Sequence, residues 1–140
     1  MGVIGGGIGA FIGDVHRKAS RMDGEIELLV GVFHINPKNP DKTGNVLYLP
    51  SKRVYGDDKE VIKAESALPE GECIDFVAMT TPNNWHFAIV RDFLKAGFHV
   101  MCEKPMTLTS KEAKDMVVRK DVGKIRNVVV QYPQVRLDEQ

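Results

Sequence analysis

A glycine-rich segment near the start of the sequence has the spacing needed to hold phosphate groups. Residues 5–10 read Gly-Gly-Gly-Ile-Gly-Ala and match the pattern G-x-G-x-x-G/A. In this pattern Gly5 permits a tight turn, Gly7 lets the backbone approach a pyrophosphate, and the small Ala10 allows close helix–strand packing. A helix that begins here directs free N–H groups and a positive dipole at the phosphates. The segment therefore predicts a dinucleotide site that includes Gly5, Gly7, Ile8, Gly9 and Ala10.

Glycine-rich segments also occur in turns that bind no ligand and in phosphate-hydrolysing P-loops. A glycine-rich turn without a ligand is the simpler alternative, but its position between a strand-like run and a helical pattern favours a dinucleotide. A phosphate-hydrolysing P-loop is excluded because no Gly-Lys-Ser/Thr follows the glycines.

The region expected to contact the adenosine ribose lacks the usual acid. Dinucleotide-binding domains commonly place an Asp or Glu roughly 20 residues past the glycines to bind the ribose hydroxyls. Here residues 33–37 read Phe-His-Ile-Asn-Pro, in which Asn36 can hydrogen-bond a ribose. No carboxylate is present to repel a 2′-phosphate, and Lys38 and Lys42 are near in sequence. The expected cofactor is therefore either NAD or NADP, and the residues do not decide between them.

Two polar turns follow later strand-like runs and should lie at the same end of a parallel sheet. Thr81, Pro82 and Asn83 are expected to contact the cofactor, and Glu103-Lys104-Pro105 forms the second turn. Lys104 is the predicted catalytic residue, because an ammonium can donate to a developing alkoxide and take part in proton transfer as hydride leaves carbon. Glu103 would orient that ammonium, although an exposed Glu–Lys pair without function is the alternative.

Trp85 and His86 follow the first of these turns and fall in the first turn of a predicted helix. We expect a packed aromatic and a hydrogen-bonded structural histidine rather than substrate contacts.

The elements that position these residues alternate between strand and helix. Apolar runs predict strands at 1–4, 26–33, 74–79 and 99–102, with a brief strand at 54–55 and a loop with a short helix at 41–49. A first helix is predicted by one shared apolar face, formed by Phe11, Ile12, Val15, Ala19 and Met22. A second helix should begin at the N-cap Asp57 and run through Leu68, and a third should carry the apolar residues from Phe87 to Leu94 and end at Gly97. A fourth should begin at the capping box of Thr109 and Glu112 and run through about Val118. This order predicts a Rossmann-type, doubly wound, mostly parallel α/β sheet.

Composition narrows the possible partners. The 140 residues carry 19 basic and 19 acidic side chains, so no positive excess is available for a nucleic acid. Cys73 and Cys102 have no CxxC partner, and we expect reduced thiols and no metal site. We see no signal peptide and no run long enough to span a bilayer, so a cytoplasmic protein without membrane contact is expected.

Several segments together resemble the Gfo/Idh/MocA (glucose-fructose oxidoreductase and inositol dehydrogenase) family. They are residues 2–13, Val15-His16-Arg17, Thr81-Pro82-Asn83 with His86, and residues 96–100 leading into Glu103-Lys104-Pro105-Met106. The resemblance implies an NAD(P)-dependent dehydrogenase that moves hydride between the nicotinamide and a secondary alcohol of a sugar, a polyol or a derivative. It places Lys104 at the active-site lysine of the Glu-Lys-Pro motif and places Thr81, Pro82 and Asn83 beside the nicotinamide ribose.

The sequence also departs from that family. Residues 1–120 resemble its NAD(P)-binding domain, shortened near 117–122, and residues 123–140 resemble the start of its second, substrate-binding α/β domain. Within that segment residues 123–133 resemble the domain's opening strand, and the β-branched run at 125–132 predicts a strand. The rest of that domain, which supplies further catalytic groups and the oligomer interface, has no counterpart here. A homo-oligomer is expected for a full-length form. The alternative is a truncated fragment that binds a dinucleotide without catalytic activity of its own.

Overall fold

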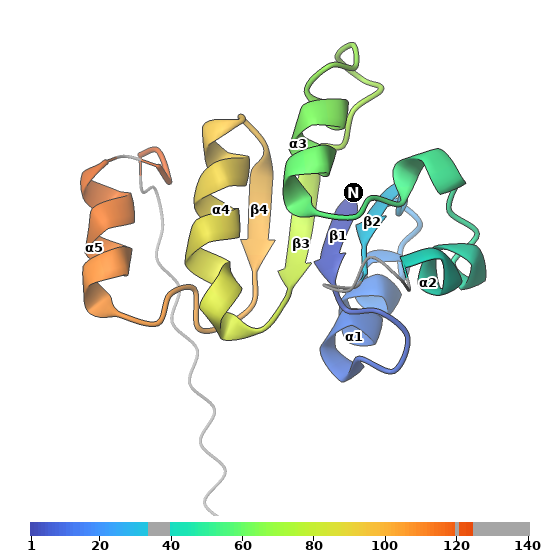
Figure 1. Ribbon diagram of the computed structural model, residues 1–140, viewed down its shortest axis with the longest axis horizontal. Coiled ribbons are helices and arrows are strands. Elements are labelled where there is room, and N and C mark those ends of the chain that lie inside the picture. The colour runs from blue at the N-terminus through green and yellow to red at the C-terminus, as the bar shows by residue number, and fades with distance from the viewer. Residues whose placement is uncertain (34–39, 120, 125–140) are drawn as a thin grey trace, which may run out of the picture.

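The computed structural model describes residues 1–33, 40–119 and 121–124. Its centre is a parallel sheet of four strands in the order β2-β1-β3-β4 (Figure 1). The strands are β1 (Gly2–Gly5), β2 (Val30–Val32), β3 (Phe76–Thr80) and β4 (His99–Cys102). The step from β2 back across β1 to β3 is the reversal of strand order that defines a doubly wound sheet. The predicted Rossmann-type fold is confirmed.

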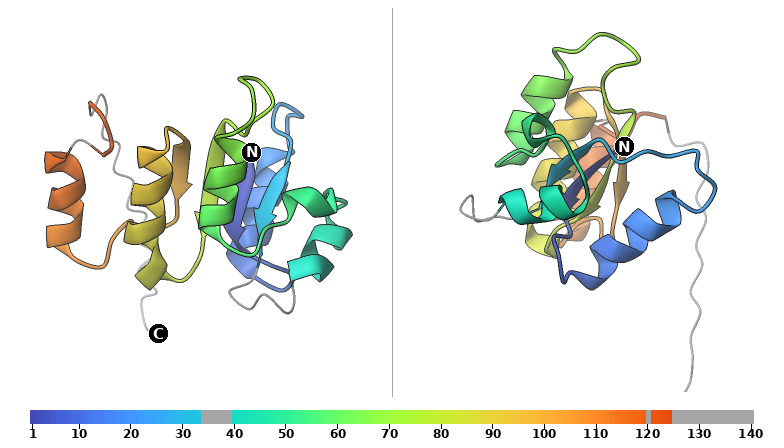
Figure 2. Two further views of the ribbon diagram at one scale, coloured as in Figure 1. Left: turned by 45° about the horizontal axis from the view of Figure 1, so that its top comes forward. Right: turned by 90° about the vertical axis from the view of Figure 1, so that its right-hand side faces the viewer.

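Helices lie on both faces of this sheet. They are α1 (Phe11–Ser20), α2 (Pro40–Val46), α3 (Asp58–Glu65), α4 (His86–Lys95) and α5 (Ser110–Val118), with 3-10 turns η1 (Ser51–Arg53) and η2 (Asn83–Trp85). Figure 2 shows α1 on one face of the sheet and α3 and α4 on the other. The capping box at Thr109 and Glu112 and the N-cap at Asp57 are both formed as predicted. The left-handed Gly97 follows α4, also as predicted.

The face covered by α3 and α4 holds most of the core. Val61 of α3, Val77 of β3 and Phe93 of α4 are fully buried in one cluster, and Met116 of α5 joins them. Phe93 packs edge-on against Phe98, with ring centroids 5.9 Å apart. Burial of these large side chains provides the main driving force for folding on this side.

The α1 face is built differently from the sequence prediction. The helix forms, but the apolar face predicted for it is not buried: Phe11 is 82% exposed and Val15 is 42% exposed. The buried residues of α1 are Gly13 and Arg17 instead. The helix therefore contacts the rest of the protein through a small residue and a charged one, and the 3.6-residue apolar period did not identify its inner face.

Two predicted elements are shorter than expected. The strand predicted at 26–33 is confined to β2, and the helix predicted through Leu68 ends at Glu65. The segment after η1 touches the outer edge of β2, because Val54 forms a parallel bridge with Gly31 and Tyr55 N donates to Gly31 O at 2.9 Å. The strand predicted at 125–132 lies outside the described residues.

None of the helices in the described part of the chain has the length and apolarity needed to cross a bilayer. Both cysteines are free thiols. Within the described ranges, no cluster of three or more His, Cys, Asp or Glu side chains is arranged to hold a metal ion.

Candidate dinucleotide site

The turn between β1 and α1 is shaped by close backbone contacts. A Cβ on Gly7 would lie 2.8 Å from Phe33 O, so no larger residue fits beside the end of β2. Gly6 has a φ of +64°, and a Cβ there would lie 2.7 Å from Gly13 Cα. The glycine pattern treats residue 6 as variable, whereas the structure requires glycine at that position.

Two side chains brace this turn, and neither contact was predicted from the sequence, although Arg17 is part of the family-like segment Val15-His16-Arg17. The guanidinium of Arg17, 8% exposed, donates to Gly6 O. The hydroxyl of Thr43 in α2, 3% exposed, accepts from Ile8 N at 3.2 Å. The turn is thus held from α1 on one side and from α2 on the other. No local signal could have revealed these contacts, since the partners are 11 and 35 residues apart.

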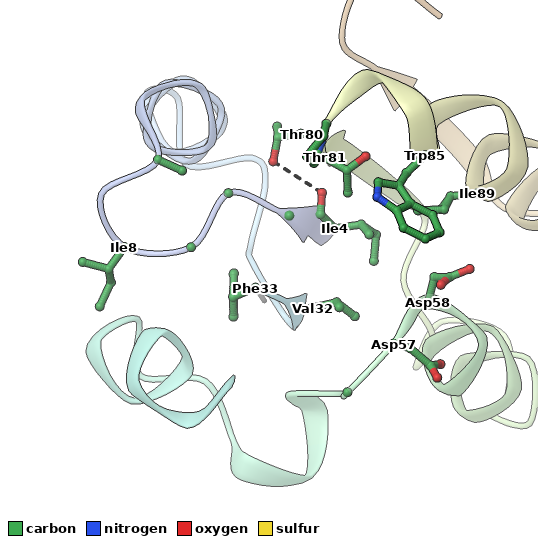
Figure 3. A pocket seen from close by; sticks show the side chains of 16 residues that line it. Ile4, Ile8, Val32, Phe33, Asp57, Asp58, Thr80, Thr81, Trp85 and Ile89 are labelled. Carbon is green, nitrogen blue, oxygen red and sulfur yellow. Dashed lines mark hydrogen bonds between the residues drawn. The ribbon is translucent and has the colours of Figure 1, made fainter. Parts of the chain in front are cut away.

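A pocket of about 470 Å³ opens beside the turn (Figure 3). Six of the predicted cofactor residues line it: Gly5, Gly7, Ile8, Ala10, Thr81 and Pro82. Gly9 lines a second hollow between α1 and α2. The remaining lining comes from the ends of β2 and β3 and from the starts of α3 and α4. A crevice at the carboxyl ends of the strands, where their order reverses, is the usual ligand position in open α/β sheets.

One polar atom in this pocket points to a ligand. Thr81 Oγ1 is buried and has no hydrogen-bond partner among the described residues. Its neighbour Thr80 is satisfied, because its hydroxyl donates to Ile4 O at 3.4 Å (Figure 3). A buried hydroxyl without a partner costs free energy, and a polar ligand in the pocket would remove that cost. The residues present therefore fit a dinucleotide with its phosphates at the glycine turn.

The turn after β4 leaves the sheet at the same edge as the glycine turn (Figure 1). Glu103 N donates to Met79 O at 3.2 Å, which extends the pairing of β4 with β3. The Glu103 carboxylate is 2.8 Å from His16 Nε2 of α1, and its other oxygen accepts from Lys104 N at 3.3 Å. The hydrogen bond from His16 lowers the pKa of Glu103, so this carboxylate stays ionised. Lys104 is exposed and is joined to Pro105 by a cis peptide bond.

His86 links the two polar turns. Its side chain is fully buried, with Nδ1 at 2.6 Å from Pro105 O and Nε2 at 2.9 Å from Thr81 O. The predicted structural histidine is therefore confirmed. The accompanying prediction for Trp85 is wrong: the indole is 45% exposed and lines the pocket. Trp85 is in η2, where the chain turns around the pocket rim before α4 begins.

Three other predicted site residues are described by the structure and do not line the pocket. Asn83, Glu103 and Lys104 are absent from its lining, although all three follow strands that end at this edge. Asn36 and Lys38 lie outside the described residues, and Lys42 is exposed and outside the lining. The pocket includes instead Asp57 and Asp58, of which only Asp57 had a predicted role, as a helix cap.

This glycine turn on a doubly wound sheet defines a dinucleotide-binding Rossmann domain. Residues 1–131 match the Gfo/Idh/MocA family, described as an oxidoreductase family with an NAD-binding Rossmann fold. The chain belongs to this family. The predicted resemblance is confirmed.

Relatives support the assignment over part of their own lengths. The chain is 31% identical to the uncharacterized oxidoreductase YfiI of Bacillus subtilis over 90% of this chain and 32% of the relative. An inositol dehydrogenase homolog from Azotobacter vinelandii, in a crystal structure with NADH and myo-inositol, is 37% identical, with a TM-score of 0.78 over 85% of this chain and 31% of that one. An oxidoreductase from Sinorhizobium meliloti is 42% identical, with a TM-score of 0.77 over 86% and 33%. The chain thus spans about a third of the length of these relatives.

Proposed function

We propose that this chain holds NAD for a dehydrogenase that oxidises a secondary alcohol of a sugar, a polyol or a related compound. The observation that carries the proposal is the meeting of three segments at one sheet edge: the glycine turn, the Thr80–Pro82 turn with its unpartnered hydroxyl, and the turn that bears Lys104. The inositol dehydrogenase homolog, crystallised with NADH and myo-inositol, supports this substrate class.

NAD, when bound, supplies the hydride acceptor. In the proposed reaction the alcohol carbon loses a hydride and its hydroxyl loses a proton. Lys104 interacts with that hydroxyl, stabilises the negative charge that develops on oxygen and takes part in the proton transfer. Glu103 does not contact the substrate in this proposal. It positions Lys104, because its carboxylate is hydrogen-bonded both to the Lys104 backbone N–H and to His16 of α1.

The charge of the pocket supports NAD rather than NADP. Asp57 and Asp58 line it, while its lining includes no lysine or arginine among the described residues. A 2′-phosphate would bring negative charge toward these carboxylates, and the described part of the lining has no guanidinium or ammonium to receive it. We therefore expect NAD to bind more tightly than NADP.

Calorimetric titration of the chain with NAD tests the binding step. The matched variants are Thr81→Val, which removes the unpartnered hydroxyl, and Thr81→Ser, which keeps it. We expect Thr81→Val to weaken NAD binding by about 5- to 10-fold, the value of one neutral hydrogen bond. Its thermal stability should not fall, because the lost hydroxyl has no hydrogen-bond partner among the residues that the structure describes. Equal NAD affinity in the wild type and Thr81→Val would contradict this placement of the cofactor.

Formation of NADH from NAD with a panel of polyols, myo-inositol included, tests the chemical step. Activity that is lost in Lys104→Met while NAD affinity is kept would support Lys104 as the catalytic residue. An equal loss of NAD affinity would contradict that role. NAD binding with no turnover of any polyol would favour a chain that binds the dinucleotide without being an enzyme by itself.

A further inference from the structure

One end of the pocket combines an aromatic face with a partly buried carboxylate. Trp85 of η2, Ile89 of α4 and Asp58 at the start of α3 lie together there, while Ile8 of the glycine turn lies at the opposite end (Figure 3). Ile89 is 7% exposed and gives this end an apolar wall. The exposed indole of Trp85 extends that wall toward the opening.

The sheet topology indicates which half of a dinucleotide would reach this end. Asp57 and Asp58 follow the segment in which Val54 bridges Gly31 on the outer edge of β2. They therefore approach the pocket from the β2 side, and Lys104 follows β4 on the other side. Trp85 follows β3 and faces Asp58 across this end of the pocket (Figure 3). With the pyrophosphate at the glycine turn, the two nucleotide halves extend in opposite directions. If the nicotinamide faces the Lys104 side, the adenosine half lies near Asp58.

The two aspartates differ in their availability. The Asp57 carboxylate caps α3 by accepting from Glu60 N at 2.8 Å. Asp58 is half-buried, and its pKa is raised, first by burial and then by the nearby carboxylates of Asp57 and Asp92. A carboxylate with reduced hydration gains more from a hydrogen-bond donor than a fully hydrated one does. Adenine offers such a donor in its 6-amino group, and its flat faces suit an indole.

We propose that Trp85 and Asp58 select adenine: the indole stacks on the base, and the Asp58 carboxylate accepts a hydrogen bond from the 6-amino group. This selection rests on the proposed binding of NAD by the chain. It assigns a base-reading role to the start of α3, which the glycine pattern does not cover. It also makes the carboxylate an acceptor that the 6-oxo group of a purine cannot satisfy.

Nicotinamide hypoxanthine dinucleotide provides a direct test, because it differs from NAD only in the base, which has an oxo group in place of the 6-amino group and a hydrogen on N1. We expect the wild-type chain to bind NAD at least about tenfold more tightly than this analogue, since the oxo group would face a carboxylate. In Asp58→Asn the amide can accept from an amino group or donate to an oxo group. The preference should therefore fall to about twofold or less. Asp57→Asn is the matched control and should keep the wild-type preference.

Trp85 is the sole tryptophan of the chain and provides a second readout. AMP should quench its fluorescence and nicotinamide mononucleotide should not. Trp85→Ala should weaken NAD and the hypoxanthine analogue by the same factor, roughly tenfold, while Trp85→Phe should recover most of the affinity for both.

The outcomes separate this inference from the proposed function. Equal affinities for NAD and the analogue in the wild type, or an unchanged preference in Asp58→Asn, would overturn the role of Asp58. Quenching by nicotinamide mononucleotide alone would overturn the placement of adenine beside Trp85. If calorimetry detects binding of neither dinucleotide, both the inference and the proposed function fail. Because the preference is a ratio measured within one variant, a uniform loss of folded protein does not alter it.

Discussion

The two faces of the sheet are stabilised in different ways. On the α3 and α4 face, large apolar side chains such as Phe93 and Val61 are fully buried. On the α1 face, the helix approaches through Gly13 and Arg17 and leaves Phe11 exposed. The first face contributes stability mainly through burial of apolar area. The second face has a smaller apolar cluster that includes Val3 and Ala78, and there α1 holds the glycine turn in place through close backbone approach and a hydrogen bond. The helices on the two faces thus differ in how they contact the sheet: α3 and α4 through large apolar side chains, and α1 through a small residue and a buried arginine.

The largest expected effect is on the α3 and α4 face. Phe93→Ala should lower the free energy of unfolding by about 3–5 kcal/mol, because it leaves a cavity where Phe93 meets Phe98. Urea unfolding followed by circular dichroism measures this loss. A loss below about 1 kcal/mol would mean that this face is not the main source of stability.

A smaller but more specific effect is expected where α1 meets the turn. A Cβ on Gly13 would lie 2.4 Å from Gly6 Cα, so Gly13→Ala must displace the turn or the helix. We expect a loss of about 1–3 kcal/mol in unfolding free energy together with weaker NAD binding. Thermal unfolding and calorimetric titration measure the two effects. Ala19→Ser, an exposed change on the same helix, is the control and should alter neither.

The link between α1 and the Lys104 turn should depend on pH. The hydrogen bond from His16 lowers the pKa of Glu103 below its ordinary value of 4.5, so its stabilising effect is present above that value and is lost as the pH falls through the lower folded-state pKa. Glu103→Gln should therefore cost about 0.5–1 kcal/mol near neutral pH and progressively less below about pH 4. Thermal unfolding across this range provides the measurement. A cost that does not change with pH would show that the charge of Glu103 is unimportant to the link.

The smallest effect is expected at the exposed position of α1. Phe11→Ala removes a ring that is 82% exposed and should change the unfolding free energy by less than about 0.5 kcal/mol. Chemical denaturation alongside Phe93→Ala compares one aromatic residue on each face. Similar losses for the two variants would remove the contrast between the faces.

The sequence predicted features that depend on neighbours along the chain. The glycine turn, the capping box of Thr109 and Glu112 and the strand His99–Cys102 are local patterns, and the structure contains all three. The parallel, doubly wound sheet followed from the alternation of strand and helix.

Features that depend on distant partners could not be predicted in the same way. Arg17 is buried because Gly6 O accepts from it, and an isolated helical pattern gives an arginine no reason to face inward. Glu65 is fully buried because Ile74 N donates to it at 3.1 Å and Arg53 Nε lies 3.8 Å away. Trp85 was predicted to pack because aromatic residues usually do, yet it lines the pocket.

The sheet is also asymmetric at its two ends. The outer edge of β2 is partly closed by the bridge between Val54 and Gly31. Among the described residues, β4 pairs only with β3, so its other edge presents backbone donors and acceptors in an extended row. Such a row is a template on which a further strand can add in register, whether it comes from the same polypeptide or from another. A further strand can therefore pair with β4, at the edge of the sheet that bears Lys104, more readily than with β2.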